Sequence, residues 1–266
     1  MKITVIGAGN IGSALVEGLL MEGSISASDI ILTDISIENL ASFAEMGVNV
    51  MQSNVEACKN ADMIVICVKP HIVKVVMEEI LPSLTYNTLL ISFAAGVSFS
   101  QLHTFTDNFP MPVFRAIPNT AMSVCQSMTC ISASENVTSA QRDLVLSFFS
   151  RIGKALFVDE SLMDAATVLA SCGTAFALRY LRAATEAGVE TGFNPTVAKE
   201  IVAQTMLGAA VLITGSGKHP EIEIDKVTTP GGLTIKGLNQ MEHAGFSSTV
   251  VQGILAAFMQ LKNYST

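Results

Sequence analysis

The feature that most constrains this chain is a glycine pattern directly after its first apolar run. The run KITVIG (2–7) leads into Gly7, Gly9 and Gly12, spaced G-x-G-x-x-G, and a helical pattern over 10–22 opens inside it. Glycines at this spacing allow a tight turn, a close approach of backbone to a pyrophosphate and close packing of helix on strand. With a strand before it and a helix after it, the pattern predicts a dinucleotide site. The alternative is a glycine-rich turn that binds nothing.

The rest of the first 160 residues alternates short apolar runs with helical patterns. Helices are predicted at 10–22, 36–46, 70–81 and 138–152, and further strands at 29–34, 62–68, 88–94, 112–118, 127–133 and 154–159. Several of the runs are apolar on both faces, which is typical of parallel strands covered by helices. The alternation predicts a doubly wound α/β domain over residues 1–160.

From Ser161 on, strand signals disappear and long helical patterns follow. Two stretches, Val168–Leu178 and Met206–Ile213, are apolar on nearly every face. A helix that is apolar all round has to be buried all round. Residues 161–266 are too few to bury both stretches from within, so we expect an all-helical domain that is covered by a second subunit.

Composition excludes several classes of partner. The formal net charge of −8 argues against nucleic acid, because phosphate contacts need clustered Lys and Arg. No apolar run is expected to reach the roughly 18–20 residues needed to span a bilayer, and the start lacks the pattern of a signal peptide, so we expect no membrane. The five cysteines form no C-x-x-C pair and indicate reduced thiols of a cytoplasmic protein, and the four histidines lack metal-ligand spacing, so we expect no metal.

The second predicted strand ends in LTDIS, which places Asp34 where an acid can accept hydrogen bonds from the adenine ribose hydroxyls. Its charge would repel a 2′-phosphate, and no arginine lies nearby to compensate, so we expect NADH to be preferred to NADPH. The alternative is that Asp34 caps the helix that starts near Ile37.

Two later strands end in CVKP (67–70) and FAAG (93–96), and residues at the carboxyl ends of parallel strands line a cofactor crevice. Lys69 can equally be a solvated loop lysine. The cofactor-binding residues predicted from these patterns and the glycine turn are Gly7, Ala8, Gly9, Asn10, Ile11, Gly12, Asp34, Val68, Lys69, Pro70, Ala94, Ala95 and Gly96.

The stretch VTTPGGLTIKGLNQME (227–242) begins like a helix start inside the helical region. Thr229 is expected as the N-cap and Pro230 in the first turn, with apolar periodicity from Leu233 on. The glycines leave backbone N–H groups uncovered, and bare amides at a helix N-terminus attract anions. The alternative is a plain turn and cap without a ligand.

Taken together, these residues resemble the pyrroline-5-carboxylate reductase family over essentially the whole chain. The resemblance rests on I-G-A-G-N-I-G at the start, V-K-P at 68–70, A-A-G at 94–96, P-N-T at 118–120 and D-K-V-T-T-P-G-G-L-T-I-K-G-L at 225–238. It implies a Rossmann domain (1–160) followed by an all-helical dimerisation domain (161–266). It also implies hydride transfer from NAD(P)H to the cyclic imine 1-pyrroline-5-carboxylate, which gives L-proline.

The resemblance also assigns roles to individual residues. Asn54 matches a position near the adenosine ribose. Thr234 matches the residue that hydrogen-bonds the ring nitrogen, which makes it the candidate catalytic residue. The substrate-binding residues implied are Glu160, Thr229, Gly231, Gly232 and Thr234. For Glu160 the alternative is a negative charge at the N-terminus of the following helix. The cofactor of one subunit is expected to face helices of the C-terminal region, in a homodimer or a larger oligomer built from dimers.

The chain departs from the family pattern at three places. Ser171-Cys172-Gly173-Thr174 stands where Gly-Ser-Gly-Pro is common, Ala121 where proline is frequent, and Asp34 where many members carry a small polar residue. Two other functions stay open. One is a β-hydroxyacid dehydrogenase, which needs a catalytic lysine on the long interdomain helix, whereas this chain has none between Lys154 and Lys199. The other is a dinucleotide-binding regulatory homologue without turnover.

Overall fold

The computed structural model describes the chain from Met1 to residue 265, with side chains to residue 262. It contains two compact units, one formed by Met1–Cys172 with the end of the chain from Phe258 on, and one formed by Gly173–Ala257. The division falls beyond the boundary expected at residue 160. The reason is that Ala166 and Ala170 are buried against Cys130 of the sheet, so the segment that follows residue 160 packs with the first unit.

The first unit is built on an eight-stranded sheet with the order β3-β2-β1-β4-β5-β6-β7-β8. This order, which runs outward in both directions from β1, is that of a doubly wound fold, as predicted. The strands are β1 (Ile3–Ile6), β2 (Ile30–Thr33), β3 (Asn49–Met51), β4 (Met63–Ile66), β5 (Leu89–Ser92), β6 (Val113–Ile117), β7 (Ser127–Ala133) and β8 (Gly153–Phe157).

Two features of the sheet differ from the prediction. Strand β3 was missed because it is a short edge strand in which Val50 is flanked by a polar residue. Strand β7 runs antiparallel to β6, whereas every other neighbouring pair is parallel. Only the short helix η4 (Thr120–Val124) joins β6 to β7, and a parallel return needs a crossover of a dozen or more residues.

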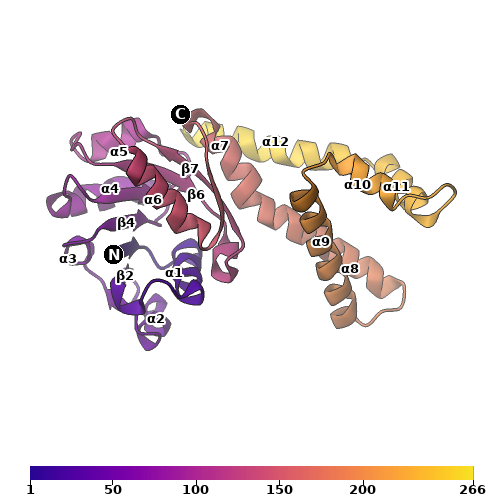
Figure 1. Cartoon of the computed structure of the whole chain (residues 1–266), viewed down its shortest axis with the longest axis horizontal. Helices are drawn as coiled ribbons and strands as arrows, with labels where there is room; N and C mark the ends of the chain where they lie inside the picture. The colour runs from indigo at the N-terminus through magenta and orange to yellow at the C-terminus, as the bar shows by residue number, and fades with distance from the viewer. Residues whose placement is uncertain (266) are drawn as a thin grey trace. The chain divides into compact units, whose positions relative to one another are not determined.

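Helices cover both faces of the sheet (Figure 1). Successive residues of a strand point to opposite faces. Met63 and Val65 belong to the core shared with α1, α2 and α6, whereas Ile64 and Ile66 belong to the core shared with α3, α4 and α5. The helical segments are α1 (Asn10–Glu22), η1 (Ala27–Asp29), η2 (Ile37–Asn39), α2 (Ala41–Glu45), α3 (Asn54–Cys58), α4 (Pro70–Ile80), η3 (Leu81–Ser83), α5 (Phe99–Phe105), η4, α6 (Ser139–Ser150), η5 (Glu160–Leu162), α7 (Met163–Ala166) and η6 (Thr167–Cys172).

The second unit is all-helical, as predicted. Its helices are α8 (Gly173–Glu190), α9 (Pro195–Ser216), α10 (Pro220–Lys226), α11 (Leu233–His243) and the first part of α12 (Phe246–Ser265). Among the residues described in this unit, Ala198 alone is buried. Helices α8 and α9 pack on each other, but they leave most of their apolar surface uncovered.

Two helical segments have the length and mean hydropathy of a membrane span, Glu160–Glu190 and Pro195–Ser216. The bent pair Leu233–His243 and Phe246–Lys262 would make a third span if it counted as one. By this criterion the expectation of no span-length segment is wrong. Alanine, glycine and threonine interrupt the runs of large apolar residues, yet the mean hydropathy over 18 residues stays high.

The uncovered surface of the second unit carries large apolar side chains. Leu178, Leu207 and Val211 are 59%, 56% and 59% exposed, respectively. A cavity of about 320 Å³ in the same unit is lined almost entirely by apolar atoms, from residues including Phe176, Tyr180, Phe246 and Ile254. Monomeric proteins seldom expose contiguous apolar patches beyond a few hundred Å².

We therefore expect the chain to form a dimer through these helices, as its sequence predicted. Light scattering on the purified protein at micromolar concentration should give twice the mass of one chain or an even multiple of it. Val211→Glu, which puts a charge on the uncovered face of α9, should weaken the dimer or cause aggregation, and Lys199→Glu serves as a control for added charge on the same helix. A stable, active monomer of the unmodified chain would contradict this expectation.

Candidate active site

The turn between β1 and α1 has a geometry that only glycine can provide. Gly7 adopts a φ of +102°, and its N–H donates to the carbonyl of Thr33 at 2.8 Å. A Cβ on Gly12 would lie 1.9 Å from the carbonyl oxygen of Gly7, so helix and turn touch directly. Gly9 is the N-cap of α1 and offers no capping side chain, so the first amides of the helix are open to an anion.

A cavity of about 320 Å³ lies beside this turn. It brings together six of the predicted cofactor residues from four separate segments: Gly7, Gly9, Asp34, Asn54, Val68 and Lys69. Pro70, Ala95 and Gly96 line another cavity, and Ala94 is buried. The ends of β1, β2 and β4 therefore meet in one crevice, as the carboxyl ends of neighbouring parallel strands should.

The carboxylate of Asp34 links the end of β2 to the glycine turn through hydrogen bonds. Its Oδ2 accepts the N–H of Ala8 at 2.8 Å, and its Oδ1 accepts from the N–H of Ser36 at 2.9 Å and from Nδ2 of Asn39 at 3.2 Å. Ser36, not Asp34, occupies the N-cap position of η2. Lys69, which is exposed, is the only cationic side chain among those that line this cavity in the described structure.

Two further side chains shape the wall of the crevice. Asn54 accepts from the hydroxyl of Thr33 at 2.6 Å and donates to Glu79 Oε2 at 2.9 Å, so its amide is held at the edge of the cavity. Cys67 also lines the cavity but is buried, and burial raises the pKa of its thiol far above the usual range. A thiol held in its protonated form is a poor nucleophile, so we assign no covalent role to Cys67.

Asn119, in the P-N-T stretch, joins the end of β6 to the segment that leads into α8. Its Nδ2 donates to the carbonyl of Ala170 at 2.9 Å, and its Oδ1 accepts the N–H of Ala121 at 3.0 Å. Ala170 lies in η6, a stretch of π-helix, and such stretches are frequent at functional sites. Ala121 supplies an N–H that a proline at this position would lack. The sequence identified P-N-T as a motif but did not reveal this link.

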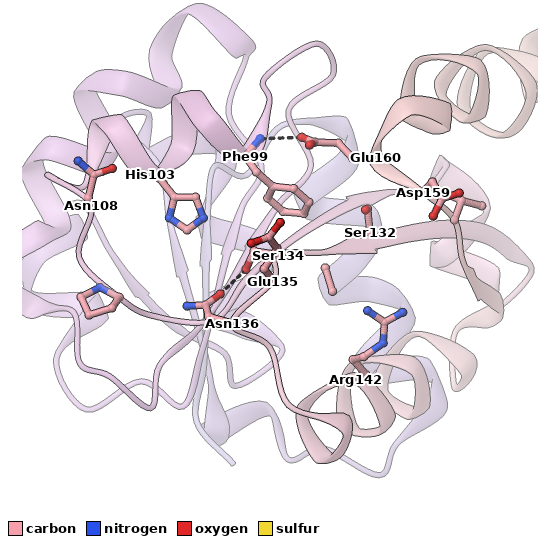
Figure 2. A pocket seen from close by; sticks show the side chains of 13 residues that line it. Phe99, His103, Asn108, Ser132, Ser134, Glu135, Asn136, Arg142, Asp159 and Glu160 are labelled. Atoms are coloured by element: carbon pink, nitrogen blue, oxygen red, sulfur yellow. Dashed lines mark hydrogen bonds between the residues drawn. The ribbon is translucent and has the colours of Figure 1, made fainter.

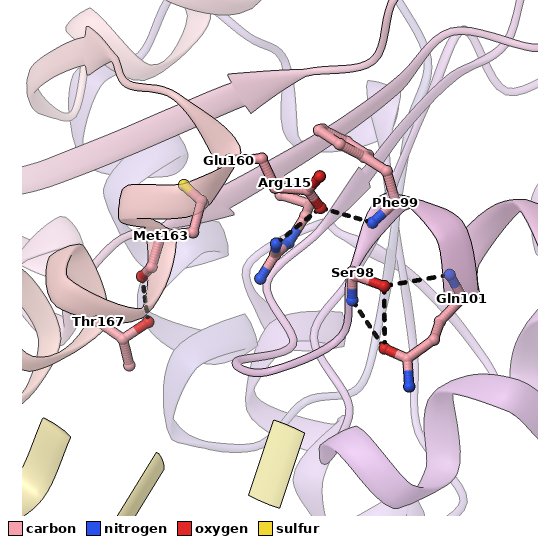
Figure 3. A network of polar contacts seen from close by, with 7 residues as sticks. All are labelled: Ser98, Phe99, Gln101, Arg115, Glu160, Met163 and Thr167. Carbon is pink, nitrogen blue, oxygen red and sulfur yellow. Dashed lines mark hydrogen bonds and ion pairs between the residues drawn. The ribbon is translucent and has the colours of Figure 1, made fainter. Parts of the chain in front are cut away.

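Glu160 makes a contact that the sequence did not predict. Its Oε1 accepts from Nη1 of Arg115 at 2.9 Å and from the N–H of Phe99 at 2.7 Å (Figure 3). Arg115 comes from the middle of β6, and its guanidinium is almost entirely buried. The only available signal was an arginine inside the apolar run PVFRAIP. Because Oε1 of Glu160 already accepts these two hydrogen bonds, Oε2 is the oxygen left to contact a substrate.

A larger cavity, of about 610 Å³, lies next to Glu160 (Figure 2). Its lining residues include Phe99, Ser132, Arg142 and Asp159, but none of the predicted cofactor residues. Glu160 is the only predicted site residue on its wall. The cavity beside Glu160 is therefore separate from the nucleotide crevice.

The segment Thr229–Thr234 differs from the expected cap. The N–H of Gly232 donates to the carbonyl of Thr229 at 2.9 Å, so Thr229–Gly232 is a turn with Pro230 and Gly231 at its centre and a φ of +70° at Gly231. Gly232 is the N-cap of α11, and the expectation that Thr229 caps this helix is wrong. Proline fits the second position of such a turn and glycine the third. Because Gly232 has no capping side chain, the amides that start α11 are open to an anion.

Comparison with known proteins identifies the family. Residues 160–264 match the model for pyrroline-5-carboxylate reductase dimerisation, and residues 2–96 match the model for NADP oxidoreductase, coenzyme F420-dependent. Pyrroline-5-carboxylate reductase 2 of Dictyostelium discoideum is 36% identical over 96% of this chain and 90% of its own length. The chain belongs to the pyrroline-5-carboxylate reductase family.

Two other family members illustrate the extent of the match. Pyrroline-5-carboxylate reductase 1 of Dictyostelium discoideum is also 36% identical over 96% of this chain, which spans about half (48%) of that relative. The crystal structure of Plasmodium falciparum pyrroline carboxylate reductase with NADP bound superimposes with a TM-score of 0.91 at 28% identity, covering 100% of this chain and 98% of that one. The likeness therefore extends through both units.

The glycine turn leads to a prediction that separates a nucleotide site from an empty turn. A Cβ on Gly9 would meet no atom within 4 Å beyond its chain neighbours, so Gly9→Ala should fold, with a melting temperature lowered only by the poorer N-cap. If a pyrophosphate approaches this backbone, the added methyl group should weaken NADH binding by about tenfold or more. Gly12→Ala should lower both stability and binding. Calorimetry and NADH titration measure the two effects, and normal binding by a stable Gly9→Ala variant would support a turn without a ligand.

Proposed function

We propose that this chain is a 1-pyrroline-5-carboxylate reductase that uses NAD(P)H to reduce the C=N bond of the cyclic imine and releases L-proline. The observation that carries the proposal is the full-length similarity to the family together with an intact D-K-V-T-T-P-G-G-L-T-I-K-G-L segment. The substrate is then a small molecule with an imine nitrogen and a carboxylate.

The nicotinamide cofactor, when bound, supplies the hydride, so the chain itself has to bind and orient its two substrates. The crevice residues fit a dinucleotide. The uncapped start of α1 suits the pyrophosphate, and Asp34 and Asn54 suit the adenosine ribose. We assign Val68, Lys69 and the Ala94–Gly96 turn, at the ends of the next strands, to the rest of the cofactor.

We assign the substrate carboxylate to the start of α11. The turn of Thr229, Gly231 and Gly232 ends in open amides, which favour a negative charge. Thr234, in the first turn of the same helix and exposed, can hydrogen-bond the ring nitrogen. A threonine hydroxyl is a very weak acid, so this bond orients the nitrogen, and the proton comes from water or with an iminium form of the substrate. Glu160 Oε2 is assigned to the substrate as well.

We further propose a homodimer or an oligomer built from dimers, in the cytoplasm. The uncovered apolar helices of the second unit and the match to a dimerisation model support the first part. A second copy would also account for the two span-length segments without a membrane. The five cysteines are all free thiols, which supports a reducing compartment.

One assay separates this function from the two alternatives. Purified protein should oxidise NADH or NADPH only when 1-pyrroline-5-carboxylate is present, and proline should accumulate in equal amount. A regulatory homologue would bind the cofactor without turnover, and a β-hydroxyacid dehydrogenase would act on a hydroxyacid with NAD⁺. The altered Ser171–Thr174 segment, which follows Ala170, the partner of Asn119, is the departure that leaves the regulatory alternative open.

Asp34 is expected to set the cofactor preference toward NADH. A carboxylate beside the ribose repels a 2′-phosphate, and among the cavity's described side chains Lys69 alone is positive. Asp34→Ser should raise kcat/KM for NADPH relative to NADH by about tenfold, or about 1.4 kcal/mol. Glu38→Gln, a nearby exposed acid, is the control. If the unmodified enzyme prefers NADPH by tenfold or more, other residues control the choice.

Thr234→Ala should lower kcat/KM for 1-pyrroline-5-carboxylate by about ten- to a hundredfold, since a hydrogen bond to a charged group contributes roughly 1.5–3 kcal/mol. Thr234→Ser, which keeps the hydroxyl, should retain most of the activity. NADH affinity should stay unchanged in both variants. Unaltered steady-state kinetics in Thr234→Ala would reduce Thr234 to a residue of the helix surface. Light scattering on each variant checks that the dimer persists.

A further inference from the structure

Arg115 is a buried charge in the middle of a sheet. It lies on β6, opposite Ser92 of β5 and Ser132 of β7, and is 5% exposed. Its Nη1 donates a hydrogen bond to Glu160 Oε1. Its Nε is buried and has no hydrogen-bond partner, alone in this respect among the buried side-chain atoms of the described residues. Removing a guanidinium from water is costly unless the charge is paired. Burying Arg115 with an unpaired Nε therefore lowers the free energy of unfolding.

The carboxylate that pairs with Arg115 also fixes the start of a helix. Glu160 Oε1 accepts the N–H of Phe99, a residue 61 positions earlier and the first of α5. Ser98 and Gln101 form a capping box at the same helix start (Figure 3). A carboxylate at a helix N-terminus is favourable because it satisfies a free amide and opposes the helix dipole.

The helix start held in this way ends the turn that contains Ala94, Ala95 and Gly96. The turn leaves β5 after Ser92 and enters α5 at Phe99, and Gly96 has a φ of +75°. The sheet fixes the position of this short connection at Ser92. The hydrogen bond between Phe99 and Glu160 fixes its other end, and Arg115 holds Glu160 in place.

We propose that Arg115 is a positioning residue for the reductase reaction. Through Glu160 it fixes the N-terminus of α5, and with it the Ala94–Gly96 turn against which the nicotinamide half of the cofactor binds. A buried ion pair is seldom more stable than well-packed apolar residues, so we attribute its presence to geometry rather than to stability. The inference rests on the proposed function, because it assigns that turn to the cofactor.

The test compares cofactor affinity in four proteins: unmodified, Glu160→Gln, Arg115→Met and the double variant. The chain has no tryptophan, so NADH fluorescence on binding can be titrated without interference and without any imine. We expect each single variant to bind NADH about tenfold more weakly, and the double variant to bind no more weakly than Arg115→Met, because both changes break one linkage. Arg115→Lys, which keeps the charge, should recover part of the affinity. Asp159→Asn, a change at the neighbouring exposed acid, is the control and should bind normally.

Three outcomes would overturn the proposal. A Glu160→Gln variant that raises the KM for 1-pyrroline-5-carboxylate but binds NADH normally would show that Glu160 acts on the substrate alone. Arg115→Met that melts at a lower temperature but binds NADH normally would make the pair purely structural. Additive losses in the double variant would show that the two residues act separately.

If Arg115→Met does not fold, Glu160→Gln still decides, since it replaces a partly exposed carboxylate by an amide of the same shape. Failure of the unmodified protein to reduce the imine would refute the proposed function, whereas the NADH titrations test the linkage independently.

Discussion

The first unit depends on the direct contact between α1 and the turn that precedes it. With no Cβ on Gly12, the helix approaches the carbonyl of Gly7 so closely that an added methyl group would lie 1.9 Å away. This contact places the bare N-terminus of α1 at the ends of β1 and β4. Asp34 then bonds the N–H of Ala8 and adds the end of β2 to the same point. The crevice exists because these three strand ends are drawn together.

A second set of polar contacts links segments that are far apart in the sequence. Asn119 reaches the carbonyl of Ala170, and Glu160 joins Arg115 to the amide of Phe99. Each connects β6, or the turn that follows it, to the segment that leads into α8. Buried polar groups of this kind are expensive to leave unpaired and so accept few alternative arrangements. They hold the segment that contains Glu160 and Ala170 against the first unit.

The helices of the second unit, by contrast, lack packing partners for much of their apolar surface. Its helices carry more apolar surface than they can cover themselves, and only Ala198 is buried among its described residues. The same composition gives two segments the hydropathy of membrane spans. A second copy of the chain and a lipid bilayer would both cover such surfaces. The membership in a family with a dimerisation domain favours the first.

Apolar periodicity and glycine spacing are local properties, so the sequence predicted the doubly wound sheet, the helical second unit and the glycine turn. It also marked Asp34, Val68 and Lys69, and the family resemblance added Asn54; the fold gathers these four residues around one cavity. The antiparallel return of β7, the cap at Gly232 and the pairing of Arg115 with Glu160 became evident only in the folded chain. A pairing across 45 residues leaves no periodic trace, since it depends on where the sheet and η5 bring the two side chains together.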